Sequence, residues 1–365
     1  MKFRRHTKLI RSPLPLPQPG LLPNNRWLAV ITRALKTVEV LVFKVLQFFD
    51  LYRPQKSIIG IPSLATSKFA LIQAAVFNGT QEEVLGYRPR RLLHRLLKGL
   101  PDVEMFERVR FKIALPDQPM RTVELGTELK GFIHHPLQWD IRNLPKMAWL
   151  RMRAAGVATT VGNLQLGDYE VISSPVFFLN EEVKWVIISD IDDTIKDSHV
   201  ALTTARREIL RSLFQGHYYK YEAIPGMAEL YQELAAKGAL IVYVTSTPYQ
   251  LAPFILKFLR QANFPDGPIF LRWLGYNRFG HKIRALTRVL NHVKHHRCIL
   301  VGDSGEQDLQ IYRRICEVAQ YGDHVEKILI RHVPGTPLPK VKHQREHSYK
   351  SVDQLREKLD FILSS

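Results

Sequence analysis

The chain has 365 residues, 45% of them apolar and 24% charged, which predicts two soluble folded units and argues against a fibrous or largely disordered protein. Its formal net charge of +18 and isoelectric point near 9.9 favour an anionic partner such as nucleic acid, lipid headgroups or phosphorylated substrates. The two cysteines, Cys298 and Cys316, form no CxxC pair, so we expect neither a disulfide framework nor a zinc site, and a reducing cytoplasm fits best.

The first 53 residues are predicted to contain two segments. Residues 1–25 are basic and rich in proline, a composition typical of disorder, and they lack the apolar core and cleavage site of a secretory signal. Residues 26–53 carry apolar side chains at helical spacing, which predicts an amphipathic helix whose charges interrupt any membrane-spanning run. This helix either lies in a membrane interface or packs on the protein itself.

Residues 54–180 are predicted to form a β-rich accessory domain. Short alternating or β-branched runs, FALIQAAVF, RVRFKIAL and YEVISSPVFFL, are separated by Gly, Pro and Asp, as in antiparallel sheets. The stretch RPRRLLHRLLKGL is the exception, because it predicts a basic helix that ends near Gly99. We interpret that helix as a solvated connection.

Residues 181–365 show a different texture, in which apolar strands alternate with amphipathic helices. The expected strands are KWVIISD, ALIVYVTS, RCILVGD and EKILIRHV, and helices are expected at AELYQELAAKG, at APFILKFLRQA and after His281. Continuous apolar strands between helices are typical of a parallel sheet that is covered on both faces. The fold class predicted for this part is therefore α/β, with a Rossmann-like parallel sheet.

Acidic residues gather directly after the first of these strands. Asp190, Asp192 and Asp193 follow VIIS, at the strand end where open α/β sheets build their sites. Such crowded carboxylates repel one another unless a cation is bound or a proton is shared, and hard oxygen ligands favour magnesium. The string DxDxT is weak evidence by itself, because an acidic turn capped by Asp193 or Thr194 explains it equally well.

Three further features follow in order along the predicted sheet. The strand ALIVYV ends in three hydroxyls that can hold phosphate oxygens or cap the next helix: Thr245, Ser246 and Thr247. Lys282 begins a helix, where an ammonium can offset the charge of a phosphoryl group. The strand RCILVGD is followed by a second acidic group, Asp303, Glu306 and Asp308. Together these features predict a phosphoryl-transfer site.

This order of motifs resembles that of the haloacid dehalogenase superfamily. The segments ISDIDDTIKDS, IPGM, VTSTPYQLAPFILKFL, FPDGPIFLR, GHK, VGDSGEQDLQIY and KILIRHV resemble more closely the catalytic domain of the actin-patch-associated phosphatidate phosphatases and their bacterial relatives. The resemblance covers about residues 183–333, with Tyr249 where the family tends to carry Trp. It implies a sheet of haloacid dehalogenase type without a large cap, preceded by the small β-rich domain.

The resemblance also implies roles for individual residues. Asp190 would be the nucleophile and Asp192 the general acid and base, a role that suits a carboxyl of raised pKa. Phosphate would be held by Lys282 and by Thr245 or Ser246, with the choice of hydroxyl left open. The implied cofactor is Mg²⁺, with ligands Asp190, Asp192, Asp303 and Asp308.

The substrate is predicted from the spacing between motifs. Neither the interval from Asp197 to Ala239 nor that from Thr245 to Lys282 can hold a large lid, and an open site suits a bulky substrate. The basic N-terminal region favours a lipid, so we expect phosphatidate to be cleaved to diacylglycerol and phosphate at an anionic membrane surface. Alternatives are a phosphatase for another bulky substrate such as a phosphoprotein, and a non-catalytic module that binds anionic lipid. A nucleic-acid-binding function is not expected, because no recognition motif is found.

Overall fold

The computed structural model describes residues 56–78, 108–114, 121–126, 132–138, 147–159, 162–164, 171–197, 222–272, 278–293 and 295–364. Every described residue belongs to one compact unit, residues 53–365. The predictions for residues 1–25, for the amphipathic helix and for the basic helix near Gly99 lie outside the described residues.

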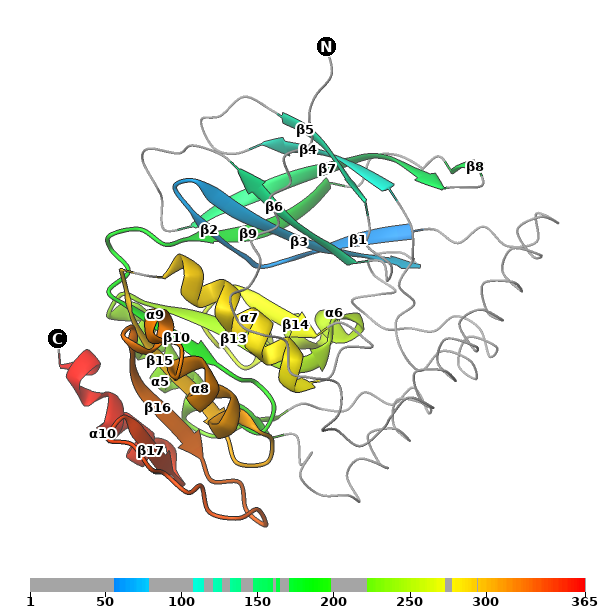
Figure 1. Cartoon of the computed structure of the whole chain (residues 1–365). Helices are drawn as coiled ribbons and strands as arrows, with labels where there is room; N and C mark the ends of the chain where they lie inside the picture. The colour runs from blue at the N-terminus through cyan, green and yellow to red at the C-terminus, as the bar shows by residue number, and fades with distance from the viewer. Residues whose placement is uncertain are drawn as a thin grey trace, which may run out of the picture. The chain divides into compact units, whose positions relative to one another are not determined.

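The first part of the described chain is a β-sheet, as predicted (Figure 1). Its nine described strands are β1 (Lys56–Ile61), β2 (Ser63–Thr66), β3 (Phe69–Asn78), β4 (Arg108–Ala114), β5 (Arg121–Gly126), β6 (Phe132–Gln138), β7 (Met147–Thr159), β8 (Gly162–Leu164) and β9 (Val171–Phe178). Seven of them follow the order β1-β3-β2-β9-β7-β4-β5, while β6 pairs with β3 and β8 with β7. All of these pairs are antiparallel except β2 with β9. The three runs singled out in the sequence are β3, β4 and β9, and the domain boundaries stay predictions.

The second described sheet has six parallel strands in the order β14-β13-β10-β15-β16-β17. They are β10 (Trp185–Ser189), β13 (Ala239–Pro248), β14 (Ile269–Arg272), β15 (Arg297–Asp303), β16 (Val325–Arg331) and β17 (Glu346–Tyr349). The predicted parallel α/β sheet is confirmed. Because β10 lies between β13 and β15, the strands that carry the motifs are neighbours, and their carboxyl ends meet at one edge.

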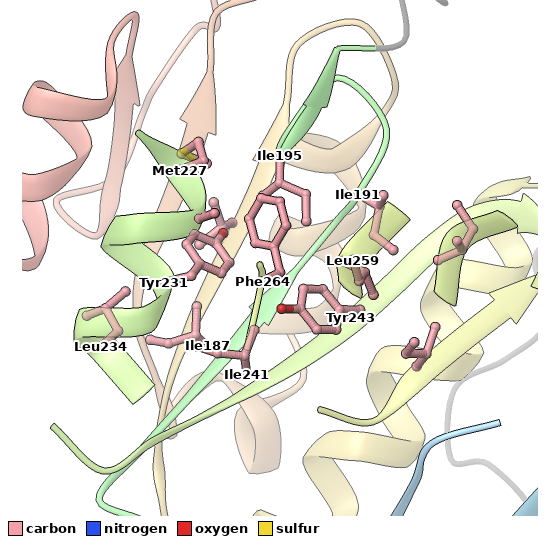
Figure 2. Close-up of a cluster of buried hydrophobic side chains, with 14 of the residues drawn as sticks. Ile187, Ile191, Ile195, Met227, Tyr231, Leu234, Ile241, Tyr243, Leu259 and Phe264 are labelled. Carbon is pink, nitrogen blue, oxygen red and sulfur yellow. The ribbon is translucent and has the colours of Figure 1, made fainter. Parts of the chain in front are cut away.

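Helices cover this sheet on both faces. The described ones are α5 (Met227–Ala236), the 3₁₀ helix η1 (Tyr249–Leu251), α6 (Ala252–Gln261), α7 (Arg278–His292), α8 (Asp308–Cys316), α9 (Ala319–Gly322) and α10 (Val352–Leu363). Helices α7 and α8 lie side by side in Figure 1, and α5 and α10 contact each other. Apolar residues of α5, α6 and α10 share one buried cluster with alternate strand residues such as Ile187 and Ile241, part of which Figure 2 shows.

Residues in the first sheet and its turns form hydrogen bonds with the edge strand β14. The Ile269 amide donates to the Pro62 carbonyl at 3.1 Å, and Gln73 Nε2 donates to the Ile269 carbonyl at 3.0 Å. Ile59 and Ile61 of β1 also belong to the cluster formed by α5 and α6. These contacts satisfy backbone groups that an edge strand otherwise exposes. The β-rich part therefore contributes to the core beside the parallel sheet.

The two intervals between motifs in which a lid domain could be inserted lie only partly within the described residues. Between β13 and α7 the described chain contains η1, α6 and β14, in agreement with the predicted helix and strand. A short hairpin of β11 (Lys196–Asp197) and β12 (Glu222–Ala223) frames the other interval, whose residues 198–221 lie outside the described part, so the lack of a large cap stays a prediction. None of the helices in the described ranges is long and apolar enough to cross a membrane.

Candidate active site

One buried ammonium lies among carboxylates at the carboxyl edge of the parallel sheet. Lys282 Nζ, from α7, lies 2.5 Å from Asp308 Oδ1, 2.9 Å from Asp190 Oδ1 and 3.1 Å from Glu306 Oε2. Burial alone would lower the pKa of Lys282, but the surrounding carboxylates, with Asp190 foremost, outweigh it and raise that pKa. Lys282 is therefore a fixed positive charge in a buried acidic cluster.

Two of these acidic residues form, together with Asp303, a group that could hold a metal ion. Asp190, Asp303 and Asp308 each offer a carboxylate oxygen, and these oxygens lie within 4.8 Å of one another. All three side chains are buried. Burial raises the pKa of each of the three carboxyl groups, and the neighbouring carboxylates raise it further, whereas Lys282 lowers it. For Asp190 and Asp303 the neighbouring carboxylate with the largest effect is Asp308. Such mutual repulsion is relieved by a bound cation.

Two buried oxygens of this group have no hydrogen-bond partner in the described part of the chain, which supports the same interpretation. Asp303 Oδ1 accepts hydrogen bonds from the amides of Gly305 at 2.5 Å and Glu306 at 3.0 Å, whereas the buried Asp303 Oδ2 has no hydrogen-bond partner among the described residues. Asp190 Oδ1 is also without one, because its contact with Lys282 has the distance of an ion pair but not the angles of a hydrogen bond. Hard carboxylate oxygens that accept no hydrogen bond fit Mg²⁺.

Gly302 makes room for Asp308. A Cβ atom at position 302 would lie 2.5 Å from Asp308 Oδ2 and 2.7 Å from Asp308 Cβ, so any larger residue would displace that carboxylate. The same Oδ2 accepts a hydrogen bond from the Asp303 amide at 3.2 Å. The sequence Gly302-Asp303 therefore fixes Asp308, the first residue of α8, against the end of β15.

Asp192 has a different environment from the one predicted. Its Oδ1 lies 2.5 Å from Lys196 Nζ, and its Oδ2 accepts hydrogen bonds from Thr245 Oγ1 at 3.0 Å and Thr247 Oγ1 at 2.6 Å. Burial alone would raise the pKa of Asp192, but Lys196 and then the two hydroxyls outweigh it, so the pKa lies below its ordinary value. The raised pKa that would suit a general acid and base is therefore not found at Asp192 in this arrangement, and its predicted role stays a prediction.

A tight turn brings Lys196 to Asp192. The Lys196 amide donates to the Ile191 carbonyl at 3.0 Å, and the Asp193 amide donates to the Lys196 carbonyl at 2.8 Å. Asp193 has a φ of 55°, a left-handed conformation that Asp tolerates better than most residues. Its carbonyl accepts a hydrogen bond from Arg331 Nη1 at 2.8 Å, which links the turn to the end of β16.

The predicted site residues thus fall into two neighbouring groups. Asp190, Lys282, Asp303 and Asp308 form the cluster around the ammonium, and the carboxylate of Asp192 lies outside the group of potential metal ligands. Thr245 is a partner of Asp192. The hydroxyl of Ser246 donates instead to Glu306 Oε2 at 3.0 Å, the same oxygen that contacts Lys282.

Two residues of the site received no role from the sequence. The sequence places Glu306 in the second acidic group and Lys196 in the segment ISDIDDTIKDS, without a role for either. The sequence does offer one indication that Lys196 pairs with Asp192, because the two opposite charges lie four residues apart. Nothing in the sequence indicates that Glu306 contacts both Ser246 and Lys282.

Comparisons with known proteins support the predicted resemblance over the parallel sheet. Residues 185–332 match the family described as the catalytic domain of phosphatidate phosphatase APP1. The phosphatidate phosphatase APP1 of Saccharomyces cerevisiae is 34% identical over 154 residues, and an uncharacterized protein of Schizosaccharomyces pombe is 28% identical over 155 residues. Each alignment covers 40% of this chain and 25% of the relative, so the chain spans about a quarter of these relatives' length.

Similar solved structures are more distant. A class C acid phosphatase from Bacillus anthracis covers 39% of this chain and 65% of its own, with 21% identity and a TM-score of 0.25. A phosphoserine phosphatase from T. onnurineus covers 51% of this chain and 98% of its own, with 18% identity and a TM-score of 0.29. Scores this low carry no argument about this chain. The match of residues 185–332 to the phosphatidate phosphatase catalytic-domain family is the comparison that bears on this chain.

Proposed function

We propose that the chain is a magnesium-dependent phosphatase, a phosphoric monoester hydrolase that converts phosphatidate or a related lipid phosphate to diacylglycerol and phosphate. The observation that carries this proposal is the buried cluster at the carboxyl edge of the sheet, in which Asp190 and Asp308 contact Lys282 and lie with Asp303 in one group of potential metal ligands. The family match of residues 185–332 supports the same chemistry. A cytoplasmic location, peripheral to a membrane, follows as part of the proposal.

In the first step, Asp190 attacks the phosphorus atom of the substrate. An Asp190 carboxylate oxygen forms the new bond, the bond from phosphorus to the glycerol oxygen breaks, and the leaving oxygen takes a proton from Asp192. Mg²⁺ held by Asp190, Asp303 and Asp308 would supply positive charge beside the phosphoryl oxygens. Lys282 supplies a second, permanent positive charge 2.9 Å from the nucleophile. The product of this step is an aspartyl phosphate.

In the second step, Asp192 accepts a proton from water, and the oxygen of that water attacks phosphorus. The bond to Asp190 breaks, which releases inorganic phosphate and restores the carboxylate. Asp192 is well placed for this second role, because Lys196, Thr245 and Thr247 hold it ionised. Over one turnover the two steps balance, because the proton that Asp192 gives to the leaving oxygen is replaced by the one that it takes from water.

We further propose that Ser246 is the hydroxyl that binds phosphate. Its Oγ contacts the same Glu306 oxygen as Lys282 Nζ, so both donors face one acceptor position. A phosphoryl oxygen placed there would replace the Glu306 carboxylate as their partner. The hydroxyls of Thr245 and Thr247 are directed to Asp192 and serve its orientation instead.

Phosphate release from different substrates tests the proposal. The 365-residue chain is incubated with Mg²⁺ and with phosphatidate vesicles, a phosphopeptide, a sugar phosphate or an aryl phosphate. We expect release from phosphatidate, abolished by Asp190→Asn because the nucleophile is lost. Asp360→Asn makes the same chemical change at an exposed position of α10 and should leave the rate unchanged.

Two other outcomes would overturn parts of the proposal. Release from the phosphopeptide but not from phosphatidate would favour a phosphoprotein phosphatase. No release from any substrate, the aryl phosphate included, together with vesicle binding, would favour a non-catalytic module for anionic lipid. Release that persists in Asp190→Asn would exclude Asp190 as the nucleophile.

A further inference from the structure

The connection between β16 and β17 is an exposed loop that is both apolar and basic. Residues 333–345, here called the 333–345 loop, contain Lys340, Lys342 and Arg345 and no acidic residue. Leu338 is 62% exposed and Val341 is 44% exposed, two of the four large apolar side chains that are exposed among the described residues. The ammonium-bearing Lys340 and Lys342 are exposed beside them. Figure 1 shows this connection extending past the end of β16.

One end of the loop is hydrogen-bonded to Ser304, next to the candidate active site. Ser304, which follows the candidate metal ligand Asp303, accepts a hydrogen bond from the Val333 amide through its Oγ at 2.9 Å. The same Oγ lies 2.6 Å from Thr336 Oγ1. Leu338 is only two residues beyond Thr336. The apolar part of the loop therefore begins beside the catalytic edge of the sheet.

The other end is fixed by a buried carboxylate. Glu346 is 4% exposed and accepts hydrogen bonds from Arg313 Nη2 at 2.6 Å, from Arg313 Nε at 2.8 Å and from the Lys342 amide at 2.6 Å. Arg313 Nη2 also donates to the Lys340 carbonyl at 2.5 Å. Because both ends are bonded and prolines lie on either side of Leu338, the loop is held in the conformation that exposes its apolar side chains.

The chemistry of this surface selects its partner. Aliphatic side chains flanked by lysines fit an anionic bilayer, where the apolar groups enter the interface and the ammonium groups contact headgroup phosphates or carboxylates. We propose that the 333–345 loop docks on an anionic phospholipid membrane and holds the catalytic edge of the sheet at its surface. This inference rests on the proposed function in one respect, because a lipid phosphate is presented at such a surface.

Binding to vesicles, measured without turnover, tests the loop directly. Sedimentation of the 365-residue chain with phosphatidylcholine vesicles that contain phosphatidylserine is compared for the wild type and two double variants, Leu338→Ser with Val341→Ser and Lys340→Gln with Lys342→Gln. Binding should fall about fivefold for each lysine removed, and by a similar factor for each apolar side chain. The matched control is Lys184→Gln with Lys237→Gln, two exposed lysines next to the amino ends of β10 and β13, which should change binding much less.

Turnover separates this inference from the proposed function. Both loop variants should lose activity on phosphatidate in vesicles and keep wild-type activity on a short-chain, water-soluble phosphatidate, since the altered side chains are exposed. Vesicle binding equal to that of the wild type in both variants would overturn the role of the loop, whatever the activity. Reduced vesicle binding in the loop variants of a protein that hydrolyses neither form of phosphatidate would support the loop and refute the lipid phosphatase.

Discussion

Replacing Lys196 with Met removes the ammonium that lies 2.5 Å from Asp192 Oδ1. The two side chains are only 4% and 12% exposed, so the variant leaves a buried carboxylate that retains the hydroxyl groups of Thr245 and Thr247. Breaking a buried ion pair costs about 3–5 kcal/mol. Because two donors remain, we expect the lower end of that range, about 3 kcal/mol, which lowers Tm by roughly 6–12 °C.

The loss of stability should depend on pH in a defined direction. In the wild type the pKa of Asp192 is lowered from 3.8, so the ion pair stabilises the folded protein above that value and stops doing so as the pH falls through the lowered pKa. In the variant, burial acts without the opposing ammonium, and Asp192 takes up a proton at higher pH than in the wild type. The deficit in Tm should therefore be largest near neutral pH and shrink in acid.

Thermal unfolding followed by circular dichroism, at neutral pH and at about pH 4, measures this deficit. Lys196→Arg keeps the positive charge and should recover part of the lost Tm. The phosphatase rate provides a second readout, because a misplaced general acid and base should lower kcat by about 100-fold or more. Equal values of Tm for wild type and Lys196→Met at neutral pH, or a deficit that does not change with pH, would refute the reasoning.

Three other substitutions have defined outcomes. Gly302→Ala places a Cβ 2.5 Å from Asp308 Oδ2 and should raise the Mg²⁺ concentration for half-maximal activity by about tenfold, and an unchanged titration would contradict the metal assignment. Glu306→Gln removes a negative charge 3.1 Å from Lys282 and should strengthen inhibition by inorganic phosphate about tenfold, which a weaker or equal inhibition would contradict. The pKa of Glu346 is lowered from 4.5 to about 2, so Glu346→Gln should cost at most about 3 kcal/mol above pH 4.5, a deficit that disappears as the pH falls toward 2 and that a pH series of Tm values would measure.

The parallel sheet was predictable because its strands are continuous apolar runs with clear ends. The predicted strand RCILVGD coincides with β15, and KWVIISD contains β10. Prediction was less complete toward the C-terminus. The four-residue β17, EHSY, has no apolar run, and its parallel pairing with β16 is decided by the fold, since Ile328 lies opposite Glu346. Helix α7 begins at Arg278, whereas the sequence predicts a helix only after His281.

The residue types of the site followed from the sequence, but the partners of Asp192 did not. Asp190 and Asp192 are two residues apart and both are buried, yet the pKa of Asp190 is raised and that of Asp192 is lowered. The difference arises from the turn at Asp193, whose positive φ returns Lys196 to Asp192 while Lys282 serves Asp190. A motif gives the order of the residues but not the direction of the chain through a turn. The motif alone therefore does not predict that Lys196 pairs with Asp192 and Lys282 with Asp190.

The charges of the cluster imply that cation and phosphate bind in a coupled way. Within the described part of the site, the carboxylates of Asp190, Glu306 and Asp308 contact the ammonium of Lys282, and Asp303 lies close to Asp190 and Asp308. A phosphate group that enters this surplus of negative charge is repelled by the same carboxylates that raise one another's pKa. A divalent cation on the Asp190 and Asp303 oxygens that accept no hydrogen bond from the described residues would offset this negative charge, so inorganic phosphate should bind far more weakly without Mg²⁺ than with it. Calorimetric titrations that found equal phosphate affinity in both conditions would mean that the cluster does not act as a cation site.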